Sequence, residues 1–79
     1  MKIYGYSHET TDELLELYEA TISASPEELR ELSIFFKNCA DSMERKGSNW
    51  NHEHFVPSDY LDGDEHPELV VFNPNAESE

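Results

Sequence analysis

Two histidines spaced two positions apart are the residues of this sequence whose chemistry most needs an explanation. His52 and His54 stand in the stretch NWNHEHF, residues 49–55, with Trp50 before them and Phe55 after them. On a β-strand, side chains two apart project from the same face. The pair could therefore hold a metal ion, carry out acid–base chemistry or line a surface on which another protein docks.

A metal site is the less favoured of these interpretations. Zinc takes about four ligands, with at least three from the protein in a catalytic site, and the pair supplies two. The spacing is also not that of the helical H-E-x-x-H motif. The residues that could add ligands are His8, His66, Asp62 and Asp64. The sequence therefore predicts no cofactor, and metal binding or metal-dependent catalysis through His52 and His54 stays as an alternative.

Nucleophilic catalysis has little support in the sequence. Cys39, the single cysteine, falls on the apolar stripe of a predicted helix, where a thiol serves as a small core residue. The chain contains no G-x-S-x-G elbow, phosphate loop or dinucleotide fingerprint. A domain of 79 residues also has little room for a deep pocket. We expect the protein not to be an enzyme.

The charge of the chain limits the classes of partner that it is expected to bind. The sequence has 18 acids and five bases, a formal net charge of −13. Nucleic acid and anionic membrane surfaces bind Lys/Arg footprints, so neither is expected as a partner, whereas a basic protein would be attracted. With no apolar run of about 18 residues, no signal peptide and one cysteine, the protein is expected in the cytoplasm.

One long helix is the clearest structural prediction, over residues 26–46. Ser25 is the expected N-cap, Pro26 opens the first turn, and Glu28 completes a capping box. Gly47 follows the last turn, where glycine commonly ends a helix. Apolar residues at spacings of three and four predict a single buried stripe. Its members are Leu29, Leu32, Phe36, Cys39, Ala40 and Met43.

Four strands complete the predicted fold. Alternating or compact apolar patterns favour strands over residues 2–7, 14–24, 49–56 and 68–73, the last one buried on both faces or nearly so; a helix over 11–20 is the competing interpretation of the second. The order β-β-α-β-β predicts an α+β domain over residues 1–74, with one helix on one face of a mostly antiparallel four-stranded sheet. Residues 75–79 are expected to form a frayed acidic tail.

A single helix covers only one face of such a sheet, so the other face is expected to be open. Tyr4 and Tyr6 share one parity of the first strand, and Trp50, His52 and His54 share one parity of the third. Aromatic residues on an open face are typical of protein interfaces. The acidic residues of the segment 57–67 lie beside this strand in the sequence. The predicted partner contacts are Trp50, His52, His54, Tyr4, Tyr6, Asp59, Asp62 and Asp64.

The order of three motifs resembles a known family. The helix start and helix ASPEELRELSIFFKNCADSME, the motif NHEHF and the strand PELVVFNP follow one another as in the bacterial immunity protein family thirty-two of polymorphic toxin systems. The resemblance covers residues of about 14–74. It implies that the protein binds and neutralises a cognate toxin encoded beside it. The resemblance carries over no catalytic residues and does not identify the toxin.

The residues and the resemblance together predict an acidic protein-binding module, an immunity protein for a basic toxin domain. Two alternatives from other classes remain open. One is the metal-binding protein or small metal-dependent enzyme built on the histidine pair. The other is a structural homodimer that joins two copies through the open sheet face and has no dedicated toxin partner.

Overall fold

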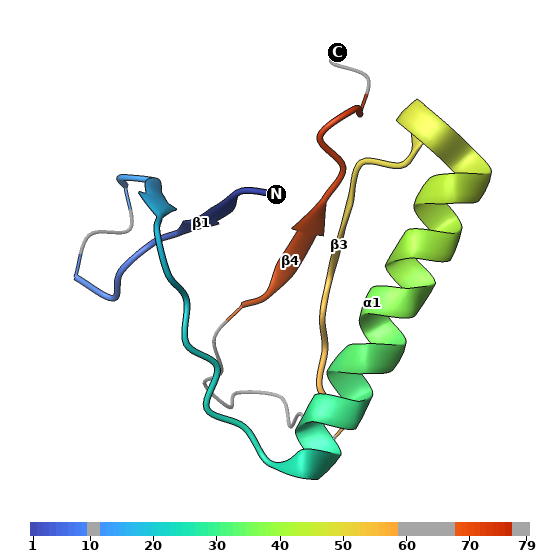
Figure 1. Ribbon diagram of the computed structural model, residues 1–79. Helices are drawn as coiled ribbons and strands as arrows, with labels where there is room; N and C mark the ends of the chain where they lie inside the picture. Colours follow the sequence, from blue (N-terminus) through green and yellow to red (C-terminus); the bar gives the residue numbers. More distant parts are fainter. Residues whose placement is uncertain (10–11, 59–67, 77–79) are drawn as a thin grey trace.

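The computed structural model describes residues 1–9, 12–58 and 68–76, and it is an α+β structure as predicted (Figure 1). Two short strands, β1 (Ile3–Gly5) and β2 (Leu15–Leu17), precede the helix α1 (Pro26–Lys46). A 3-10 turn, η1 (Gly47–Asn49), follows the helix and leads to strands β3 (His52–His54) and β4 (Val70–Phe72). Within the described residues, no helix is both long and apolar enough to cross a bilayer.

Helix α1 begins and ends where the sequence predicts. The Ser25 hydroxyl accepts a hydrogen bond from the backbone N–H of Glu28 at 3.1 Å, and the Glu28 carboxylate accepts one from the Ser25 N–H at 2.9 Å. This capping box satisfies two N–H groups that lack a partner in the first turn. Gly47 ends the helix at φ 59°, a backbone conformation that residues with a side chain rarely adopt.

The predicted four-stranded sheet is wrong, because the strands form two separate antiparallel pairs. Within the described residues, strand β1 pairs only with β2, and β3 pairs only with β4. The predicted strand 14–24 shrinks to Leu15–Leu17, since β1 offers only three partners and residues 18–25 have no strand beside them. In Figure 1 the β3–β4 pair lies beside α1, whereas the β1–β2 pair lies apart from it. The pairs are called here the first hairpin and the second hairpin.

The core lies between α1 and the second hairpin and is small. The buried apolar residues of the described chain are Leu32, Cys39 and Trp50, and the buried polar residue is Asn73. The phenylalanine that meets the second hairpin is Phe35, with its ring centroid 5.2 Å from that of Phe55. The predicted stripe is therefore only partly covered. Leu29 and Phe36, on its uncovered side, remain 48% and 43% exposed.

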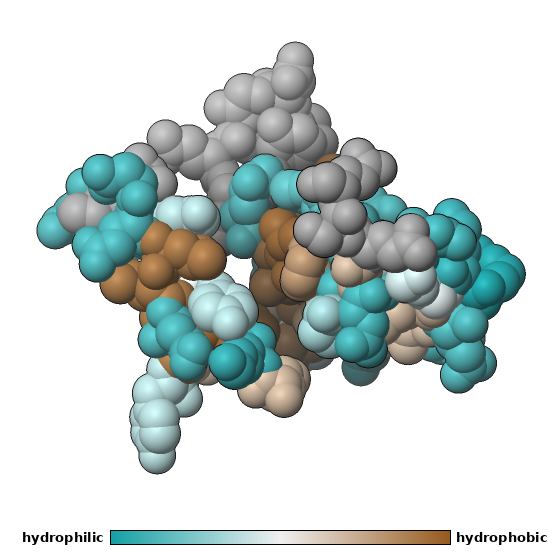
Figure 2. Space-filling model, turned by 90° about the horizontal axis from the view of Figure 1, so that it is seen from above, coloured by the Kyte–Doolittle hydropathy of each residue, from teal (hydrophilic) through white to brown (hydrophobic). Residues whose placement is uncertain are grey.

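Much apolar surface is left open. The chain exposes 7147 Å², whereas the size scaling of compact monomers gives about 4,900 Å² for this mass. Its radius of gyration is 14.0 Å, against about 12 Å for a compact domain of 79 residues. Figure 2 shows hydrophobic residues on both sides of a hollow between the first hairpin and the rest of the chain. The isolated chain therefore offers large areas that a partner could cover.

Candidate protein-binding surface

The second hairpin turns four side chains away from the helix. Its register sets His52 opposite Phe72 and His54 opposite Val70, and directly opposite residues of an antiparallel pair project from the same face. Phe55, one residue past His54, points the other way and packs on the helix. We call the set His52, His54, Val70 and Phe72 the outer face. Phe72 is 61% exposed and Val70 is 42% exposed, so this face is apolar and open.

The two histidines of the outer face lie against each other. Their ring centroids are 5.2 Å apart and the rings meet edge to face. Nδ1 of His52 lies 2.6 Å from Oδ1 of Asn51, and because an amide oxygen only accepts, this nitrogen is the donor. Nδ1 of His54 lies 3.9 Å from a carboxylate oxygen of Glu68. Among the described residues, no hydrogen bond engages the remaining ring nitrogen of either histidine.

The ligands that a metal ion would require do not gather around this pair in the described part of the chain. No group of three or more His, Cys, Asp or Glu side chains that could hold an ion occurs there. His8 lies in the first hairpin, and the other residues that could add ligands, Asp62, Asp64 and His66, fall outside the described residues. The two histidines thus stand on an apolar face and next to one carboxylate.

Tyr4 lies on a different sheet from the histidines, and Tyr6 lies one residue past the end of β1. Tyr4 is opposite Glu16 in the first hairpin, and both tyrosines are more than half exposed. Lys2 and Glu16 form an exposed ion pair at 3.9 Å beside them. Because the two hairpins form separate sheets, the tyrosines and the histidines do not share the single open face that the sequence predicts.

Trp50 is not part of an exposed face, contrary to the expectation. Its side chain is only 8% exposed. The strand begins at His52, and the 3-10 turn Gly47–Asn49 lies directly before Trp50. The alternation of a strand therefore does not extend back to residue 50. Of the other predicted contacts, Asp59, Asp62 and Asp64 lie outside the described residues.

Asn73 fixes the start and end of the second hairpin to each other. Its side chain is 2% exposed, and Nδ2 donates to the carbonyl oxygens of Gly47 at 3.1 Å and Trp50 at 2.9 Å. Its Oδ1 accepts from the N–H of Asn75 at 3.0 Å. Buried polar groups are retained when they are satisfied in this way. Sequence reasoning placed Asn73 at the end of the predicted strand 68–73 and gave its side chain no role, because its partners Gly47 and Trp50 are distant in the sequence.

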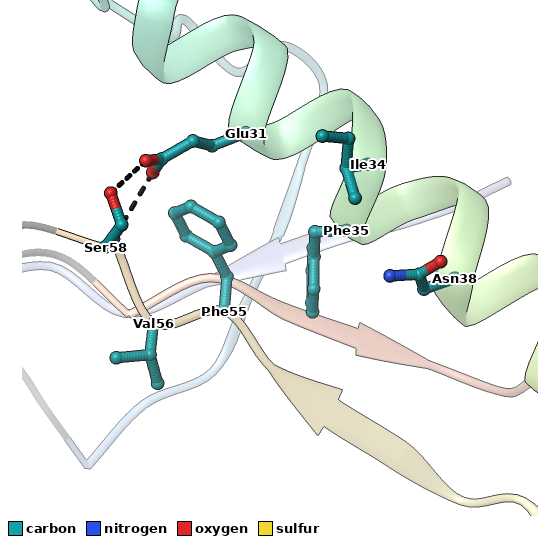
Figure 3. A pocket seen from close by; sticks show the side chains of 7 residues that line it. All are labelled: Glu31, Ile34, Phe35, Asn38, Phe55, Val56 and Ser58. Atoms are coloured by element: carbon teal, nitrogen blue, oxygen red, sulfur yellow. Dashed lines mark hydrogen bonds between the residues drawn. The ribbon is translucent and has the colours of Figure 1, made fainter.

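A groove between α1 and the end of β3 was also missed (Figure 3). Glu31, Phe35 and Asn38 recur at spacings of four and three, so they share one side of the helix. This side lies next to the predicted apolar stripe but is not part of it. The spacing is visible in the sequence, but the packing of Phe55, Val56 and Ser58 against these residues could not be predicted from it.

Comparison with known proteins gives one finding. The family model described as Immunity protein 32 matches residues 19–74 of the chain. No curated protein and no solved structure matches it. The matched residues include α1, η1 and the second hairpin, whereas both strands of the first hairpin lie before them. The outer face thus falls within the matched region, and Tyr4 and Tyr6 fall outside it.

Proposed function

The chain belongs to the Immunity protein 32 family, and from that premise we propose that it binds a cognate toxin and neutralises it without catalysing a reaction. An immunity protein of this kind protects the cell that produces the toxin, so we place its action in the cytoplasm. The toxin would be the product of a neighbouring gene. The observation that carries the proposal is the open apolar outer face within the region that matches the family.

The outer face has the composition of an interface centre. Phe72 and Val70 supply apolar area, and His52 and His54 supply flat rings with polar nitrogens. Interface cores are enriched in aromatic residues, and exposed apolar patches mark interaction sites. Tyr4 and Tyr6 would extend the contact on the first hairpin. Trp50, which is buried, would act by supporting the strand that carries the histidines rather than by touching the toxin.

The charge of the chain supports a basic toxin domain as the partner. A net charge of −13 attracts a cationic surface and speeds the encounter. Asp59, Asp62 and Asp64 are our proposed acidic contacts. Because exposed charges are screened over about 8 Å at physiological ionic strength, we expect the association rate to fall as salt is added.

The test is binding and protection by the toxin domain encoded beside the gene. Cells that express this domain should grow only when the chain is also expressed, and the purified proteins should form a complex by isothermal titration calorimetry. Phe72→Ala should weaken that complex at least tenfold. Ile22→Ala, which removes a similarly exposed apolar side chain from the segment before α1, should change the affinity less than threefold. Absence of both protection and complex formation by the wild-type chain would refute the proposal.

The large exposed area also supports a second candidate, a homodimer through the outer face. The effect of salt distinguishes a homodimer from a complex with a basic toxin. Two copies that each carry a charge of −13 repel each other, so salt should strengthen a dimer, whereas it should weaken a complex with a basic toxin. Sedimentation velocity at low and high salt measures the first effect. A dimer that Phe72→Asp disrupts would establish this interface and is compatible with immunity only if the toxin contacts other residues.

A further inference from the structure

The groove between α1 and the end of β3 has an apolar wall and an acidic end (Figure 3). Its volume is about 290 Å³, slightly below the range of about 300–1,000 Å³ that small-molecule sites occupy. This volume is enough for one long side chain. The lining residues are Glu31, Ile34, Phe35, Asn38, Phe55, Val56 and Ser58.

Glu31 is held in place at one end of this groove. The backbone N–H of Ser58 donates to its Oε2 at 3.3 Å, and the Ser58 hydroxyl donates to its Oε1. A carboxylate has about four lone-pair sites, so two remain after these bonds. Among the described residues, the groove lining contains no base and no ion pair involves Glu31. Within this part of the chain, a fixed carboxylate is thus left without a cation.

The wall beside Glu31 is made of aromatic rings and aliphatic side chains. The rings of Phe35 and Phe55 meet at 59° with centroids 5.2 Å apart. Ile34 and Val56, both largely exposed, flank them. Phe55 and Glu31 line the same groove (Figure 3). A ligand that fits must combine an apolar stem, a flat surface and a positive end.

We propose that this groove receives an arginine side chain of the toxin, with its guanidinium on Glu31 and its stem along Phe35 and Phe55. The inference rests on the proposed function and names one contact within it. The charge of the groove matches that of a cationic residue. Arginine fits better than lysine because its planar guanidinium stacks on aromatic rings and presents paired N–H donors to a carboxylate.

The preference of the groove can be tested without the toxin. N-acetyl-arginine amide should shift the methyl signals of Ile34 and Val56 in a ¹³C NMR titration with a dissociation constant in the millimolar range. N-acetyl-citrulline amide has the same shape and no charge, and it should bind at least fivefold more weakly. The Glu31→Gln chain should lose this preference. Equal binding of the two probes, or no shift at these methyls, would overturn the inference.

The role of the groove in toxin binding is tested by a matched pair of substitutions. Glu31→Gln removes the charge but keeps oxygen and nitrogen atoms that can bond with Ser58, so the fold should be retained. Glu44→Gln changes the net charge equally at an exposed position of α1 away from the groove. We expect Glu31→Gln to weaken the toxin complex at least tenfold, mainly by faster dissociation, and Glu44→Gln to weaken it less than twofold. A toxin that binds the wild-type and Glu31→Gln chains equally overturns this inference alone, whereas a toxin that binds neither overturns the proposed function.

Discussion

The two hairpins have the same number of paired residues but differ in their contacts with the rest of the chain. Each consists of three antiparallel residue pairs. The second hairpin is joined to the helix region by the Phe35–Phe55 contact, by Glu31 and Ser58, and by the buried side chain of Asn73. In the first hairpin, none of the described residues is buried. A lone two-stranded hairpin is marginally stable in water, so α1 is what makes the second hairpin the firmer part.

The same boundary separates the part that matches the family from the part that does not. The family match begins at residue 19, just after the first hairpin. The packed unit of α1, η1 and the second hairpin is thus the portion that this chain has in common with the family model. The first hairpin, with Tyr4 and Tyr6, lies outside the match, and its contribution can be measured separately. Four predictions test this contrast, from the largest effect to the smallest.

Asn73→Ala should have the largest effect on stability. It removes the partner of the Trp50 carbonyl oxygen and of the Asn75 N–H, and one of the two donors to the Gly47 carbonyl oxygen; each lost bond to a buried group costs about 1–2 kcal/mol. We expect the free energy of unfolding to fall by about 3 kcal/mol in urea denaturation followed by Trp50 fluorescence. Asn75→Ala, which removes an exposed side chain nearby, is the control and should change it by less than about 0.5 kcal/mol. Similar values for both variants would show that Asn73 does not secure the second hairpin.

Phe35→Ala should have the second largest effect on stability, and it should lower the free energy of unfolding more than Phe36→Ala does. The Phe35 ring packs on Phe55, whereas Phe36 lies on the uncovered side of the helix. For a half-buried phenylalanine we expect a loss of about 2 kcal/mol, and for Phe36 less than about 1 kcal/mol. Urea denaturation of both variants measures the difference. The reverse order would show that the first hairpin, and not the second, covers the helix.

The pair Phe35 and Phe36 also shows what the sequence could and could not predict. The helix and both its ends follow from local chemistry, because Ser25, Pro26, Glu28 and Gly47 act within a few residues of themselves. Which side of the helix is covered depends on where a distant strand packs. The predicted stripe assigned Phe36 to the core and left Phe35 out, and the structure gives the opposite arrangement.

In the candidate site too, the features set by local sequence were predicted correctly, and those that depend on distant contacts were not. The shared face of His52 and His54 follows from strand alternation and is observed. The extension of that alternation to Trp50 failed, since a 3-10 turn precedes the strand. The exposure of Val70 and Phe72 also contradicts the expectation of a strand buried on both faces. Apolar composition alone predicted burial there, but burial requires a second layer, which the separate first hairpin does not provide.

Ser25→Ala should have a moderate effect at the junction between the two regions. Loss of an N-cap costs about 1 kcal/mol. Two hydrogen bonds with Ser25 hold the pKa of the Glu28 carboxyl below its usual value. The bond of the backbone N–H has the larger effect and that of the hydroxyl the smaller. Because the folded pKa is the lower one, this contribution is present above the unfolded pKa and is lost as the pH falls through the folded pKa. NMR titration should show the Glu28 pKa rising in the variant. Because alanine keeps the backbone N–H, an unchanged pKa would mean that the Ser25 hydroxyl does not act on the Glu28 carboxyl. Ser23→Ala, outside the box, serves as the control.

Removal of residues 1–18 should have the smallest effect on stability and tests the contrast most directly. None of the described residues in this segment is buried, so the free energy of unfolding of residues 19–79 should differ from that of the full chain by less than about 0.5 kcal/mol. Amide exchange in the full chain should likewise be fast at Tyr4 and Glu16 and slow at Cys39. A loss of more than about 2 kcal/mol would show instead that the first hairpin covers Leu29 and Phe36 in solution. Toxin affinity of the shortened chain then decides a separate question: a drop at unchanged stability would assign binding to Tyr4 and Tyr6, and unchanged affinity would confine the contact to the second hairpin and its groove.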